Sequence, residues 1–306
     1  MQRHSCASSR TAPCRRNAAF RLLASFLLAM PLALHSAHSV AQQKASAFQN
    51  IVDKVSRSGS LLMLQAVCDT GKAEIRDGIA RCVACPSFTS TPGKETGFHV
   101  ANIVLGSFTQ AREPEALLYM KGCESDSTAD GGLVLLQQTT RAWSRLQYQR
   151  GIGFSECLKF RTLDDVSNLL CNHSSLSNGN QIGNIFWLDL TDNKFSLTPL
   201  LRWYDNSDSN PRELVSVFPY RFLRSDFNQD SRNDVRISFR IREEFIPEKY
   251  PGALDAINAG YRMDEPRSLN LTYLFNGVSL KLHKDSQQNL TTINRILNKH
   301  LPTIER

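Results

Sequence analysis

Residues 226–241 read DFNQDSRNDVRISFRI, a short acidic loop that runs directly into an alternating segment. Side-chain oxygens stand at loop positions 1, 3, 5 and 9, which are Asp226, Asn228, Asp230 and Asp234. A hard divalent cation such as calcium needs several oxygens that converge from one tightly curved segment. The main-chain carbonyl of Arg232 is expected to fill position 7. The loop therefore predicts a calcium site.

The segment after the loop, residues 235–241, alternates strictly between apolar and polar side chains. A period of two is typical of a strand with one buried side. Loop position 6 is Ser231 and position 12 is Ile237, where an EF-hand requires Gly and Glu. The loop is thus expected to belong to a β structure. A solvated hairpin turn is the alternative, because Asp and Asn also favour turns without a metal.

A calcium loop that leads straight into a strand resembles the FG-GAP (or VCBS) repeat, the calcium-bearing unit of integrin-α-type β-propellers. The resemblance covers roughly fifteen residues around the loop. It implies a propeller-like β fold, calcium as the cofactor, and a protein or carbohydrate ligand.

The first 41 residues have the three regions of a secretory signal peptide. They contain five arginines and no acidic residue, with an apolar stretch from Leu22 to Leu34 and the small-residue end Ser39-Val40-Ala41. The apolar stretch is short for a membrane span, so a retained anchor is the weaker alternative. We expect cleavage near Ala41 and one secreted or periplasmic domain over residues 42–306.

Loss of the signal peptide changes the charge balance of the chain. The 36 basic residues fall by five to 31, against 29 acidic residues, which leaves a net charge of +2. Arg236, Arg240 and Arg242 alternate along one segment and are expected to form a solvated sheet face. We therefore expect no nucleic-acid partner. The remainder of the sequence has no further apolar run long enough to span a membrane.

Six cysteines follow the expected cleavage site: Cys68, Cys82, Cys85, Cys123, Cys157 and Cys171. An even number in an exported chain indicates three disulfides. Cys157 and Cys171 lie beside strand-like segments a hairpin length apart, so we expect them to pair, and the other four to pair among themselves. Cys82-Val-Ala-Cys85 also has the spacing of a redox pair or of half a zinc site. The residues after it continue as a loop, and a second ligand pair is missing, which disfavours both.

Three stretches share the order acidic turn, strand, strand, tight turn, strand. They lie near residues 104–149, 152–200 and 219–283, and the first two are about fifty residues apart, a spacing typical of propeller blades. Asn276-Gly277 indicates a hairpin turn. The sequence predicts a mainly β domain of antiparallel hairpin repeats, either a small or incomplete β-propeller or a curved sheet. The alternative is that hairpins of any β protein share this order.

Short helices are expected at both ends of the β region. Apolar residues at helical spacing predict a helix over residues 45–57, with Gly59 as its stop and a strand over residues 61–67. Near the C-terminus, a helix is expected to begin at Asp285 or Ser286, with apolar positions from Leu290 to Leu301. A single helical turn is expected over residues 253–259.

No catalytic motif is found in the sequence. The histidines after residue 41 have no metal-binding spacing, and nucleophile-elbow, phosphate-loop and dinucleotide motifs are missing. The carboxylate pairs 164–165 and 243–244 point to opposite faces of an extended chain. Trp143 and Trp187 fall at equivalent places in the first two units, where a buried core position is expected, and with Trp203 they also suit a sugar-stacking platform.

These observations favour an exported, disulfide-stabilised, calcium-binding β-repeat protein that binds a protein or carbohydrate without catalysis. The alternative is a secreted or periplasmic hydrolase of cell-wall or polysaccharide material. A pocket with two or more carboxylates of raised pKa favours the hydrolase, and a flat or filled surface favours binding.

Overall fold

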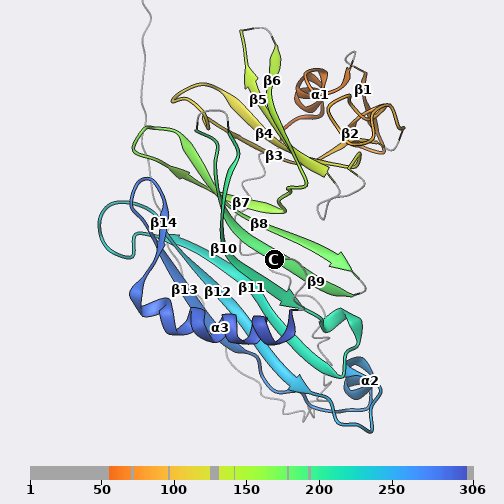
Figure 1. The fold of residues 1–306 in the computed structure, drawn as a ribbon, viewed down its shortest axis with the longest axis vertical. Coiled ribbons are helices and arrows are strands. Elements are labelled where there is room, and N and C mark those ends of the chain that lie inside the picture. The colour runs from red at the N-terminus through yellow and green to blue at the C-terminus, as the bar shows by residue number, and fades with distance from the viewer. Residues whose placement is uncertain are drawn as a thin grey trace, which may run out of the picture. The chain divides into compact units, whose positions relative to one another are not determined.

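Two antiparallel β-sheets dominate the computed structural model of the chain (Figure 1). The structure describes residues 55–69, 72–95, 97–124, 131–140, 142–177, 179–191 and 194–301. The expected signal peptide and residues 45–54 of the expected N-terminal helix lie outside these ranges. The prediction of a mainly β, antiparallel fold is confirmed. Among the described residues, no helix combines the length and the hydropathy that a membrane span requires.

The smaller sheet is a meander in which each strand pairs with the next along the chain. Its strands are β1 (Ala73–Arg76), β2 (Ile79–Cys82), β3 (His99–Gly106), β4 (Glu115–Lys121), β5 (Gly131–Gln138) and β6 (Trp143–Arg150). The central strands are buried on both sides. Leu118 packs in one apolar cluster with Met63 and Leu64 of helix α1 (Arg57–Gln65). Leu117, on the opposite side, joins a cluster with Leu188 of the larger sheet.

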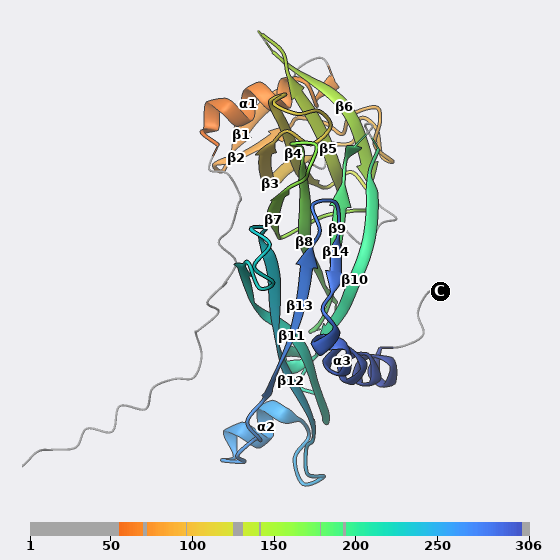
Figure 2. The ribbon, with the colours of Figure 1, turned by 90° about the vertical axis from the view of Figure 1, so that its left-hand side faces the viewer.

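The larger sheet is a second meander, and it curls into a half-barrel (Figures 1 and 2). Its strands are β7 (Glu156–Arg161), β8 (Ser167–Ser177), β9 (Asn180–Asp189), β10 (Ser196–Asp205), β11 (Glu213–Ser225), β12 (Asp234–Phe245), β13 (Arg267–Phe275) and β14 (Leu280–Leu282). The β13–β14 turn contains Asn276-Gly277, as expected, and Gly277 has a φ of 93°. A positive φ of this kind favours glycine.

Strand β12 shows why the larger sheet has one strongly apolar face. Four alternate side chains are at most 1% exposed and join one apolar cluster: Val235, Ile237, Phe239 and Ile241. On the other face Arg240 is exposed, as expected, whereas Arg236 and Arg242 are half-buried. Arg236 Nε donates to Thr272 Oγ1 at 3.2 Å, which accounts for its lower exposure.

Helix α3 (Gln287–His300) packs on this apolar face, while the short helix α2 (Ala253–Asn258) lies at the far end of the sheet (Figures 1 and 2). Three side chains of α3 are buried in the cluster: Ile293, Ile296 and Leu297. His300 Nε2 lies 3.0 Å and Lys299 Nζ 2.8 Å from the same oxygen of Glu243. These hydrogen bonds lower the pKa of Glu243 to about 2. The charged carboxylate therefore holds the helix end to β12.

All six described cysteines form disulfides. Cys157–Cys171 joins opposite residues of β7 and β8, as expected, with the Cα atoms 4.1 Å apart. The other pairs are Cys68–Cys82 and Cys85–Cys123, with Cα separations of 5.3 and 5.6 Å. The two cysteines of the Cys82-Val-Ala-Cys85 segment thus belong to different disulfides, and neither the redox nor the zinc arrangement is present.

The expected strand over residues 61–67 is wrong, because residues 57–65 form α1. The side chain of Ser56 caps the helix by accepting from Gly59 N at 3.1 Å. Gly59 therefore lies in the first turn of a helix rather than at its end. An apolar run of this length fits a strand or a buried helix equally, and the serine cap favours the helix.

The three repeat-like units correspond approximately to four strands each: β3–β6, β7–β10 and β11–β14. The second and third units are joined into one sheet, so the curved-sheet alternative is the arrangement present. The junction between the two units is the β10–β11 ladder. It is short and consists of the pairs Tyr204↔Val217 and Asp205↔Ser216. By contrast, the β11–β12 ladder extends from Glu213↔Phe245 to Ser225↔Asp234.

The expected equivalence of Trp143 and Trp187 is wrong. Trp143 begins β6 at the edge of the smaller sheet and is half-buried. Trp187 is 5% exposed in the larger sheet, with its ring centroid 5.3 Å from that of Phe160 and 5.7 Å from that of Phe275. Trp203 is 1% exposed. Two of the three tryptophans are therefore core residues and do not offer a surface for sugar stacking.

Loop length predicts how much each disulfide stabilises the fold. Residues are 38 apart in Cys85–Cys123 and 14 apart in both Cys68–Cys82 and Cys157–Cys171. Because the longer loop loses more entropy in the unfolded chain, the double serine variant of Cys85 and Cys123 should lose roughly 1 kcal/mol more than either other pair. Urea unfolding under non-reducing conditions measures this difference. A smaller loss than for the two short loops would contradict it.

Candidate binding cleft

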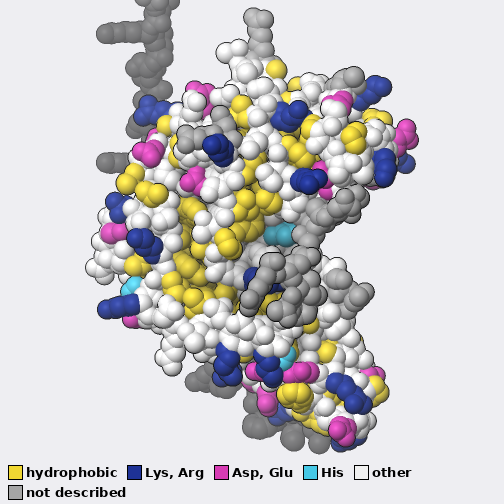
Figure 3. All heavy atoms as spheres, in the orientation of Figure 1, with side chains coloured by type: hydrophobic (Ala, Val, Ile, Leu, Met, Phe, Trp, Pro, Cys, Tyr) yellow, Lys and Arg dark blue, Asp and Glu magenta, His cyan; other side chains and the backbone are white. Residues whose placement is uncertain are grey.

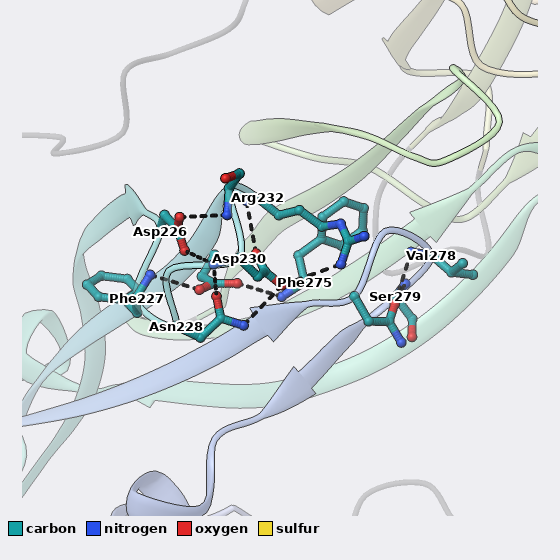
Figure 4. A network of polar contacts seen from close by, with 11 residues as sticks. Asp226, Phe227, Asn228, Asp230, Arg232, Phe275, Val278 and Ser279 are labelled. Atoms are coloured by element: carbon teal, nitrogen blue, oxygen red, sulfur yellow. Dashed lines mark hydrogen bonds and ion pairs between the residues drawn. The ribbon is translucent and has the colours of Figure 1, made fainter.

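The predicted calcium loop connects β11 to β12, and three of its predicted ligands lie together (Figure 4). Asp226 Oδ1 and Asn228 Oδ1 both accept from the main-chain N–H of Asp230, at 3.1 and 3.3 Å. Asn228 Nδ2 donates to Asp230 Oδ2 at 3.1 Å. Two of the five predicted ligands, Asp226 and Asn228, therefore direct an oxygen at the main-chain nitrogen of a third, Asp230.

Arg232, whose carbonyl was expected as a ligand, directs its own donors at Asp230. Its main-chain N–H donates to Asp230 Oδ1 at 2.9 Å, and its guanidinium lies 3.4 Å from Oδ2. The guanidinium thus places a positive charge beside a predicted calcium ligand.

Asp234, unlike the other predicted side-chain ligands, is fully buried. Its Oδ2 accepts from Phe227 N at 2.9 Å, and its Oδ1 accepts from Phe275 N at 2.8 Å. Both oxygens are therefore engaged by the main chain, one within the loop and one on β13. This carboxylate fixes the loop to the neighbouring strand.

Within the described residues, the one set of three acidic, cysteine or histidine side chains whose ligand atoms lie within 4.8 Å of one another is Glu213, Glu243 and His300. Lys299 Nζ lies 3.3 Å from Glu213 and 2.8 Å from Glu243. A cation of the protein already balances these carboxylates, so the set acts as an ion-pair network at the end of α3.

A cleft of about 690 Å³ opens beside the loop. It is bounded by the β3–β4 loop, the β7–β8 turn and the β11–β12 loop, with residues of β7 and β11 between them. Its charged lining consists of five cations and one carboxylate: Arg112, Lys159, Arg161, Arg224, Arg232 and Asp165. In the face that Figure 3 shows, Lys and Arg side chains lie around the edges of a central hydrophobic region.

Each of the three loops contributes to the cleft a non-glycine residue with a left-handed backbone. These residues are Arg112, Asp165 and Ser231, with φ values of 65°, 63° and 67°. Such a conformation costs roughly 1–2 kcal/mol for a residue with a Cβ atom. Ser231 occupies the loop position where an EF-hand has glycine, so the sharp turn is made there without it.

Asp165 is the centre of the ion pairs in the cleft. Arg161 donates to Asp165 Oδ1, and Arg112 Nε lies 3.9 Å from Oδ2. The hydrogen bond from Arg161 lowers the pKa of Asp165, and the same bond raises the pKa of Arg161. A carboxylate with a lowered pKa is ionised and is poorly suited to act as a general acid.

Lys159 and Arg224 are held by carbonyl groups instead of carboxylates. Lys159 Nζ donates to Leu105 O at 2.7 Å. Arg224 Nη1 donates to Lys159 O at 3.1 Å, which ties β11 to the edge strand β7. No ion pair to either cation occurs within the described residues.

The cleft has an aromatic floor. Phe160 and Phe275 line it, and their ring centroids are 5.3 Å apart. Both side chains are at most 3% exposed, and Trp187 packs behind them. The floor therefore belongs to the core of the half-barrel and is rigid.

The β3–β4 wall is also held by a buried carboxylate. Glu115 is 1% exposed and accepts from the main-chain N–H groups of Phe108 and Thr109. The contact with Thr109 N measures 2.8 Å. Glu115 on the first wall and Asp234 on the third thus have the same role, since each orders a cleft loop through its main-chain donors.

One carboxylate outside the cleft has a strongly raised pKa. Burial raises the pKa of Glu156 to about 7, and the hydrogen bond from Asn172 opposes this rise. Asn172 Nδ2 donates to Glu156 Oε1 at 3.1 Å, and Asn172 Oδ1 accepts from Trp203 Nε1 at 2.9 Å. Glu156 has no second carboxylate partner among the ion pairs and hydrogen bonds of the described residues, and it does not line the cleft.

The sequence pattern predicts the loop that forms one wall of this cleft, but it does not indicate the other two walls. Arg112, Arg161 and Arg224 are isolated basic residues in the sequence, and folding brings them together from distant segments. The Arg161–Asp165 pair across a tight turn was the one local signal. No protein family, curated protein or solved structure compared with this chain matches it.

The two roles of the loop aspartates predict different costs of substitution. Asp234→Ala removes the acceptor of two main-chain N–H groups, and each group left unpaired costs about 1–3 kcal/mol. Asp230→Ala, at an exposed position, should cost within roughly 1 kcal/mol. Urea unfolding in the presence of a chelator measures both losses in the absence of metal. Equal losses for the two variants would show that Asp234 does not hold the loop to β13.

Proposed function

We propose that the protein is an exported, non-catalytic binding module, and that it holds a protein or carbohydrate ligand in the cleft. The observation that carries this proposal is the left-handed residue which each of the three loops contributes to the cleft. Strained conformations at non-glycine residues persist where the surrounding structure enforces them, and they are concentrated at functional sites. Three such residues around one opening support a binding site there.

The charged groups of the cleft favour binding over hydrolysis. Its single carboxylate is Asp165, which is ion-paired and has a lowered pKa. A glycosidase requires two carboxyl groups, one of them with a raised pKa. Glu156 has a raised pKa but lies outside the cleft. Among the described residues that line this cleft, the paired carboxylates that the hydrolase alternative needs are therefore missing.

Export is supported by the disulfides and by the sequence of the N-terminal segment. Three disulfides are compatible with an oxidising compartment, where such bonds persist. The basic, apolar and small-residue regions before residue 42 have the order of a secretory signal peptide.

A blocked cleft tests the proposed function. Asn233→Trp places a bulky side chain in the cleft lining at an exposed position, whereas Ser225→Trp adds the same group to the same hairpin outside the lining. On arrays of polysaccharides and secreted proteins, the native chain and Ser225→Trp should retain a common ligand that Asn233→Trp loses. The ligand should be recovered at full length. Release of new reducing ends from a retained polysaccharide would favour the hydrolase instead.

Calcium at the β11–β12 loop forms part of the proposal. Asp226 and Asn228 direct oxygens at one main-chain N–H, Asp230 lies beside them, and exposure of the loop leaves room for water ligands. Asp234 fits less well, since it is fully buried and one of its oxygens is held by β13. Bound calcium would replace the Arg232 guanidinium as the charge that balances Asp230, and it would stiffen the wall of the cleft.

Thermal unfolding tests the calcium proposal. Calcium should raise the melting temperature by mass action, with binding at about 10⁻⁴–10⁻³ M as in other extracellular modules. Magnesium should have a much smaller effect, because its small octahedral shell fits a flexible loop poorly. Asp230→Ala should abolish the response, and Ser231→Gly should keep it while relieving the left-handed strain. A melting temperature unchanged between chelator and several millimolar calcium would show that the loop is an acidic turn.

A further inference from the structure

We infer that the cleft takes a small organic anion, in which a phosphate, sulfate or carboxylate group is attached to a larger body such as a sugar ring. The inference rests on the proposed function, because it names the chemistry of the ligand that the same cleft binds. It follows from the charge balance, the neutral donors and the volume of the cleft.

The charge balance of the lining is strongly positive. Five cations and one carboxylate give a net charge of +4 on the walls of one cleft. Charges of one sign that line a concave surface concentrate the field and attract the opposite ion. The domain as a whole is nearly neutral after the expected cleavage, at +2, so this concentration is local.

Lys159 and Arg224 are the cations best placed to receive an anion. Each bonds to a main-chain carbonyl, through contacts of 2.7 and 3.1 Å, and neither has a carboxylate partner among the described residues. A carbonyl oxygen accepts a hydrogen bond but carries no net charge, so both positive charges stay uncompensated. An oxyanion between them would form charge-assisted hydrogen bonds, which are about twice as strong as neutral ones.

Neutral donors complete the oxyanion site. The lining includes Ser107 of the β3–β4 loop, Ser167 at the start of β8, and Ser231 and Asn233 of the β11–β12 loop. Hydroxyl and amide groups donate to the oxygens that the cations leave free. Asp165 occupies part of the same space as the internal partner of Arg161, so it competes with an external anion.

The volume of the cleft indicates a ligand larger than an inorganic ion. A volume of about 690 Å³ is typical of a site for a small organic molecule. Phe160 and Phe275 close the base of the cleft, but each is at most 3% exposed, so the body of the ligand lies mainly against the polar and charged walls.

Calorimetry of the exported chain tests the inference, with glucose 6-phosphate, glucuronate, inorganic phosphate and neutral glucose as probes at matched ionic strength. At least one sugar anion should bind, and glucose should bind about tenfold more weakly or worse. Arg224→Gln should weaken sugar-anion binding about tenfold, because it removes a charge-assisted contact. Arg221→Gln, which removes an exposed charge from the same strand outside the lining, should bind like the native chain.

Asp165→Asn should raise the affinity for the sugar anion, and misfolding of a variant cannot produce such an increase. Removal of the competing carboxylate should strengthen binding of the sugar anion and leave glucose unaffected. Absence of sugar-anion binding, equal affinity for glucose, equal affinity for inorganic phosphate, or indifference to Arg224→Gln would each overturn the inference. A neutral polysaccharide that binds in an Asn233→Trp-sensitive manner would still uphold the proposed function, so the two failures are distinguishable.

Discussion

Burial of one apolar face, which runs from Leu158 on β7 to Leu280 on β14, determines how the other elements of the half-barrel are placed. An eight-stranded meander has two faces, and this one carries the aliphatic and aromatic side chains of one buried cluster. The sheet curls, and α3 packs on the exposed part of the face through Ile293 and Ile296. At the other end of the same face, Phe160 and Phe275 become the floor of the cleft. Core and cleft therefore share one continuous surface.

Buried carboxylates give the loops around this floor their shape. Glu115 and Asp234 are at most 1% exposed, and their hydrogen bonds go to main-chain N–H groups of the loops that they support. Each of these carboxylates is thus hydrogen-bonded to uncharged donors within the wall. Among the described cations of the cleft, Lys159 and Arg224 are left without a carboxylate partner, and this division makes the opening locally basic.

Local sequence patterns predicted several of the strands, turns and disulfides. The cleft, by contrast, is formed by residues that are far apart in the sequence. The alternation over residues 235–241, the Asn276-Gly277 turn and the Cys157–Cys171 pair are local patterns, and the structure contains all three. The α1 segment was misassigned because a short apolar run has no distinguishing period. The basic cleft left no pattern in the sequence, since Arg112, Arg161 and Arg224 are far apart and belong to three different loops or strands. Asp234 looked like a metal ligand by its spacing, whereas its burial gives it a main-chain role.

The short β10–β11 junction divides the half-barrel into two four-stranded hairpin pairs that share few main-chain hydrogen bonds. Side chains also join the two halves, because α3 packs on β10, β11 and β13, and Phe160 of β7 packs against Phe275 of β13. Separation of the two halves along this junction would therefore break few main-chain hydrogen bonds and would mainly expose apolar packing to water.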